Sequence, residues 1–141
     1  MMTFPWSIYD LHPMLVHFPI ALFSVGLLWD ILSEIFKKEE LESAGFWAMA
    51  MGVFSSIFTL CSGIISFLDM ASITDLLTFK HGLTELLTIV LLAVLFWVRV
   101  EFQLELRFSK MKRTLYLCLH ILAVGLLFFG AHLGVKTAGR I

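Results

Sequence analysis

Five histidines carry most of the chemistry that this sequence could perform: His12, His17, His81, His120 and His132. The sequence offers no convincing Ser-His-Asp constellation, phosphate-binding loop or carboxylate pair, so hydrolytic chemistry is not expected. Imidazole is the commonest protein ligand for metal ions, and it also binds haem iron as an axial ligand. The histidines are therefore the candidates for a cofactor or metal site.

The composition indicates that the elements positioning these histidines cross a membrane. Of the 141 residues, 60% are apolar and only 15% are charged, and the mean hydropathy is +0.94. A soluble domain is about a quarter charged. Four stretches, residues 13–36, 44–68, 73–98 and 114–135, are apolar and long enough to cross a hydrocarbon core of about 30 Å as helices. The sequence therefore predicts an all-α integral membrane four-helix bundle, up-down-up-down, as a single domain over residues 1–141.

This topology predicts that four of the five histidines gather at one side of the membrane. We name this side, where the chain starts, the N-terminal face, and the other side the opposite face. His12 and His17 open the first span, His81 opens the third, and His132 lies in the last turn of the fourth. Only His120 lies toward the opposite face. Ionisable side chains inside a membrane are costly and are usually functional, so the pattern predicts a site at the N-terminal face.

Haem b is the cofactor that this pattern favours, with electron transfer as the function. A haem in a helical bundle takes axial imidazoles from two helices, and His17 and His81 are the expected pair. His12 and His132 would form a second pair, giving one or two haems, or would support the first. Haem propionates need cationic or hydrogen-bonding neighbours. The cations available at this face are Lys80, Lys136 and Arg140.

Two carboxylates complete the predicted site. Glu85 follows His81 by one helical turn and could orient its imidazole, and Asp69 closes the second span at the same face. As an alternative, the same histidines with Asp69 could bind a bare copper, iron or zinc ion, and Met14 and Met70 would favour copper(I). No close ligand spacing such as HxxxH or CxxC supports that alternative. A third possibility is a non-catalytic membrane subunit.

The charges predict orientation and partners. The ten lysines and arginines divide seven to three in favour of the loops at the opposite face, which predicts that this face is cytoplasmic and that both termini lie outside a bacterial inner membrane. A quinone or a periplasmic redox protein is then the expected electron partner. Small residues in the second and fourth spans suit packing inside the bundle or a homodimer, and a net charge of −1 argues against nucleic acid. Asp30 and Glu34 are expected to reach water and could pair with Lys37 or Lys38.

The stretch HPMLVHFPI, residues 12–20, carries a family resemblance. Together with Gly63 and Asp69 near the end of the second span and His81 opening the third, it resembles an uncharacterised bacterial family of predicted four-helix membrane proteins with an N-terminal HPxxxHFP signature. The glycine-rich tail of that family is matched in part by AHLGVKTAG. The resemblance implies the fold and the topology. Some relatives appear alongside cytochrome or iron–sulfur domains, which implies a redox role and favours haem over a bare ion.

Overall fold

The computed structural model describes residues 8–69 and 76–137, which are helical along almost their whole length. Four helical stretches are long and apolar enough to cross a membrane, and they coincide with the four predicted spans. The predicted all-α four-helix membrane bundle is therefore confirmed. The helices, in chain order, are α1 (Ile8–Leu15), α2 (His17–Phe36), α3 (Glu39–Asp69), α4 (Leu76–Glu101), α5 (Gln103–Phe108) and α6 (Lys110–Thr137).

The first span consists of two helices, α1 and α2, because proline interrupts its hydrogen bonding. Pro19 has no N–H, so the carbonyl of Leu15 loses its partner within the helix. The Thr59 hydroxyl of α3 donates to this carbonyl oxygen at 3.3 Å. The break lies at Val16, between α1 and α2, and the contact with Thr59 fixes α1 against α3.

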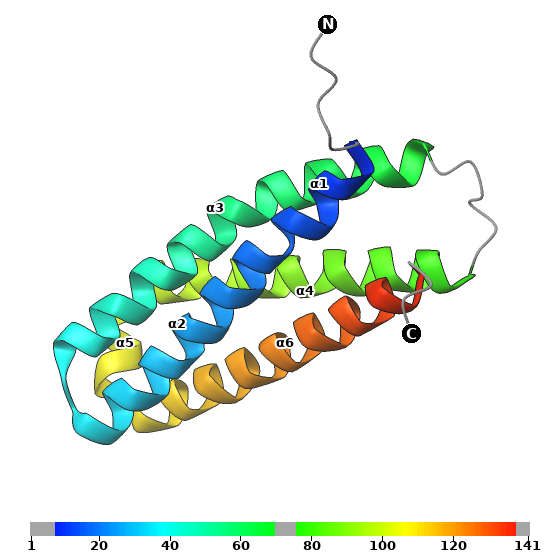
Figure 1. Ribbon diagram of the computed structural model, residues 1–141. Coiled ribbons are helices and arrows are strands. Elements are labelled where there is room, and N and C mark those ends of the chain that lie inside the picture. The colour runs from blue at the N-terminus through cyan, green and yellow to red at the C-terminus, as the bar shows by residue number, and fades with distance from the viewer. Residues whose placement is uncertain (1–7, 70–75, 138–141) are drawn as a thin grey trace, which may run out of the picture.

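The helices form two antiparallel pairs. Figure 1 shows α2 running along α3, and α4 running along α6, with α1 continuing the first pair toward the N-terminal face. Contacts of α2 with α6, and of α3 with α4, join the two pairs. Within the described residues, α1 packs against α2 and α3 only. The two pairs therefore converge toward the opposite face and separate toward the N-terminal face, as Figure 1 shows.

The middle of the bundle is a close-packed apolar core. Phe23, Met49, Leu92 and Ala123 are completely buried, and Leu127 is 1% exposed. Gly52 of α3 permits this packing, because a Cβ atom at that position would lie 2.8 Å from the Phe23 ring. The core therefore divides the polar residues at the N-terminal face from those at the opposite face.

Candidate functional site

At the N-terminal face, α1 presents His12 to α3. Its Nδ1 atom lies 3.0 Å from the Ser62 hydroxyl oxygen. Ser62 donates its one hydroxyl hydrogen to the Thr59 carbonyl at 2.9 Å, so it accepts a hydrogen bond from the His12 Nδ1–H group. This contact fixes the tautomer of His12. Its Nε2 atom consequently carries the lone pair.

His81, in the second turn of α4, is held in the same manner by α6. Its Nδ1 atom lies 2.9 Å from the Gly130 carbonyl oxygen. A carbonyl can only accept, so Nδ1 carries the hydrogen and Nε2 again carries the lone pair. Both imidazoles therefore have the hydrogen bonding that orients a histidine ligand in metal and haem proteins.

Two glycines let these imidazoles lie directly on the neighbouring helix. A Cβ atom at Gly63 of α3 would lie 3.0 Å from the Cε1 atom of His12. A Cβ atom at Gly134 of α6 would lie 2.8 Å from the Cε1 atom of His81. Any larger side chain would displace the rings, so the glycines are part of the site.

The two imidazoles come from different helix pairs. His12 lies on α1, which continues the pair of α2 and α3, whereas His81 belongs to the pair of α4 and α6. Because these pairs separate toward the N-terminal face (Figure 1), the two histidines are contributed from the two sides of the separation.

The other predicted site residues at this face lie around this pair. His17 is exposed, and its Nδ1 atom donates to the Pro13 carbonyl of α1, in the same span, at 2.6 Å. His132, Lys80 and Lys136 are also exposed. Glu85 is half-buried one turn below His81, with its carboxylate against Gly130. Arg140, Met70 and the side chain of Asp69 lie outside the described residues.

The described side chains form no cluster of three or more possible metal ligands among His, Cys, Asp and Glu. Zinc sites generally use three or four protein ligands, whereas a haem needs only one or two axial ligands.

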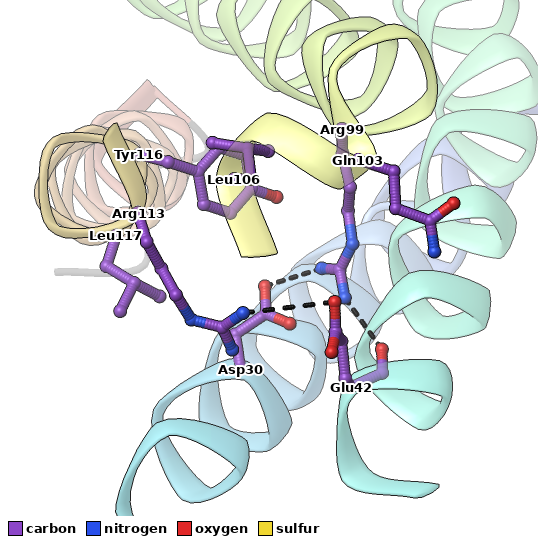
Figure 2. Close-up of a pocket in the computed structure, with 8 residues that line it drawn as sticks. All are labelled: Asp30, Glu42, Arg99, Gln103, Leu106, Arg113, Tyr116 and Leu117. Atoms are coloured by element: carbon purple, nitrogen blue, oxygen red, sulfur yellow. Dashed lines mark hydrogen bonds and ion pairs between the residues drawn. The ribbon is translucent and has the colours of Figure 1, made fainter. Parts of the chain in front are cut away.

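A second polar cluster lies near the opposite face, and here the expectation for Asp30 was wrong. Asp30 is only 3% exposed and does not pair with Lys37 or Lys38. Its Oδ2 atom accepts from Nη1 of Arg99 at 2.6 Å, and Nη2 of Arg99 donates to the Glu42 carbonyl at 2.7 Å (Figure 2). Glu34 does reach solvent and pairs with Lys37 as expected.

Two further features surround this ion pair. Gly45 lies against the carboxylate of Asp30, where a Cβ atom would lie 2.4 Å from Oδ1, so only glycine leaves room for it. Arg113 of α6 donates to the Ser33 hydroxyl at 2.8 Å and pairs with Glu42 at 3.8 Å. Asp30, Glu42 and Arg113, drawn in Figure 2, line a cavity of about 20 Å³, which is room for one water molecule.

The helical period is the sequence signal for this buried pair. The buried residues of α2 are Pro19, Phe23, Gly26, Asp30 and Ser33, which recur every three or four positions on one face. Asp30 therefore shares the inward face of α2. Arg99 follows Thr88, Leu92 and Leu95 on the inward face of α4 in the same way.

Comparison with known proteins identifies a family and no individual relative. The family model described as "Predicted membrane protein (DUF2231)" matches residues 9–141. The chain therefore belongs to this family, as the resemblance of its HPMLVHFPI stretch implied. No curated protein and no solved structure matches the chain.

Proposed function

We propose that this member of the DUF2231 family binds haem b between His12 and His81 and transfers electrons at the N-terminal face. One observation carries the proposal. His12 and His81 lie on different helix pairs, and each has its Nδ1 atom in a hydrogen bond to a neighbouring helix, which leaves the lone pair on Nε2. This proposal assigns the axial role to His12 rather than to His17, because His17 is exposed and bonds to the Pro13 carbonyl within the same span, whereas His12 bonds to α3.

The chain's own residues have distinct tasks in this proposal. A bound haem would supply one-electron redox chemistry, with its potential set by the two imidazoles and their surroundings. Ser62 and the Gly130 carbonyl hold the ligand rings in one tautomer and one orientation. Gly63 and Gly134 admit the rings against α3 and α6. The membrane-embedded core beneath the site excludes bulk water.

The remaining polar residues at this face suit the periphery of a haem. Lys80 and Lys136 are exposed beside the ligand helices and could pair with propionates. Arg140 and Asp69 retain their predicted roles as propionate partner and tuning group. Glu85, half-buried below His81, would tune the charge around the centre. The proposal takes one haem, because His17 and His132 are both exposed.

Orientation and partners follow from the surface charges. Seven of the ten lysines and arginines lie toward the opposite face, so we place that face in the cytoplasm of a bacterial inner membrane. Both termini and the haem would then lie at the outer side. A quinone from the bilayer or a redox protein at the outer surface would exchange electrons with the site.

A visible absorption spectrum of the detergent-purified protein, oxidised and then reduced with dithionite, tests the proposal. We expect a Soret band that shifts on reduction, sharp α and β bands typical of low-spin iron with two imidazole ligands, and one haem for each chain. A protein that stays colourless after addition of haemin would overturn the proposal. Copper, iron or zinc found by elemental analysis in such a colourless protein would instead support metal binding.

A further inference from the structure

Near the opposite face, α6 carries a histidine that the proposed haem site does not use. His120 is completely buried, and among the described residues neither of its ring nitrogens has a hydrogen-bond partner. A neutral imidazole presents one donor and one acceptor, and leaving them unpaired in a buried place costs free energy. An apolar side chain would avoid this cost. The imidazole therefore points to a ligand that binds to its ring nitrogens.

The nearest charged group is the carboxylate of Asp30. Nδ1 of His120 lies 3.4 Å from Oδ2 of Asp30, the same oxygen that accepts from Arg99 at 2.6 Å. A proton on His120 would place a positive charge beside this carboxylate, where burial strengthens the attraction. The Nδ1–H group could then donate a hydrogen bond to Oδ2 of Asp30, which would give this ring nitrogen a partner.

The other ionisable groups around His120 come from three helices. Arg99 of α4 opposes a positive charge on His120, and Glu42 of α3 favours it. Tyr116 and Arg113 come from α6, and the Tyr116 ring lies 5.9 Å from that of His120. Arginine remains charged at all ordinary pH values. Histidine is the group in this cluster whose charge ordinarily changes near neutrality.

A water-sized cavity lies beside Asp30, the neighbour of His120, on the side of the opposite face. The cavity of about 20 Å³ beside Asp30, Arg99 and Tyr116 has room for one water molecule (Figure 2). Glu42 and Arg113 also line this cavity, and their side chains are 19% and 18% exposed. Toward the N-terminal face, α6 continues with Ala123 and Leu127, which are buried in the apolar core.

We propose that His120, with Asp30 as its counter-ion, is a proton-binding site inside the membrane that is loaded from the water at the opposite face. Buried ionisable groups in membrane helices often form proton relays, and this cluster has a basic group, a counter-ion and a water-sized cavity. Binding adds one proton to the imidazole and breaks no other bond. The site is separate from the haem site and does not depend on it.

NMR of the full chain in lipid nanodiscs, with ¹⁵N-labelled histidine, tests this proposal. The His120→Gln variant identifies the His120 signals. We expect the His120 signals to change from those of a neutral to those of a cationic imidazole when the pH is lowered. In the Asp30→Asn/Arg99→Gln variant, which removes both members of the ion pair together, we expect His120 to stay neutral throughout.

The His132 signal is the internal reference, because His132 lies twelve residues beyond His120 on α6 and the double substitution should leave its signal unchanged. A His120 signal that stays neutral in the unsubstituted protein would overturn the proposal. A His120 that still becomes cationic in the double variant would show that Asp30 is not its counter-ion, and would overturn it equally.

Discussion

Asp30→Ala is expected to lower the free energy of unfolding by about 3–5 kcal/mol, because it leaves a buried charge unpaired. Arg99 is 7% exposed, and its guanidinium depends on Asp30 as its only carboxylate partner among the described residues. Denaturant or SDS titration in mixed micelles, followed by circular dichroism, measures the change. The Gly45 surface beside the missing carboxylate would also be left poorly packed.

Two control variants distinguish the stability lost by breaking the buried ion pair from the stability lost by removing an ordinary surface charge. Glu34→Ala removes a carboxylate whose side chain is 33% exposed, and it should cost less than about 1 kcal/mol. The Asp30→Leu/Arg99→Met double variant removes both charges, and it should recover most of the stability lost in Asp30→Ala. Equal losses in Asp30→Ala and in the double variant would mean that packing, not the unpaired charge, dominates.

His81→Ala and His12→Ala are each expected to weaken haem binding by about 100-fold or more. Loss of a residue that only supports a metal ligand already costs about 10–100-fold in affinity, so loss of the ligand itself should cost at least as much. Titration of the purified protein with haemin, followed at the Soret band, measures the affinity. The bands of low-spin haem should also disappear, because one axial position is left to water or to a weak ligand.

His17→Ala is the matched control, since His17 lies on the same span and near the same face. Its imidazole is exposed and donates to the Pro13 carbonyl of α1, within the same span. We expect this variant to retain its haem affinity and its spectrum. If His17→Ala abolished the spectrum and His12→Ala did not, the pair expected from the sequence alone would be correct and our proposed pair would be wrong.

The sequence sufficed to predict the transmembrane architecture because length and hydropathy decide it. A run of about 20 apolar residues can satisfy its backbone in lipid only as a helix, whatever its neighbours. Alternating helix directions then bring the starts of the first and third spans to the same face. His12 and His81 could therefore be placed at one depth without knowledge of any contact.

The choice between His12 and His17 could not be made from the sequence. They are five residues apart and so about 140° apart around a helix, which means that only one can face a given neighbour. The break at Val16 and the contact of Thr59 with the Leu15 carbonyl set the rotation of α1. The contact of Thr59 with Leu15 joins residues 44 positions apart, and local sequence patterns do not encode it.

The buried pair of Asp30 and Arg99 was missed for a related reason. Both residues lie near the ends of their helices at the opposite face, where a charged side chain ordinarily reaches water. Their pairing depends on α2 and α4 approaching the same interior point, across 69 residues of sequence. The inward helical period of Asp30 was visible, but the partner that makes its burial possible was not.

The most direct test of the central claim is the reduced spectrum of a variant that retains only two of the five histidines. In His17→Ala/His120→Gln/His132→Ala, the histidines left are His12 and His81. After reconstitution with haemin and reduction, we predict one haem for each chain and the same α, β and Soret bands as in the unsubstituted protein. Loss of those bands in a variant that remains folded by circular dichroism would contradict the assignment of His12 and His81 as the axial pair.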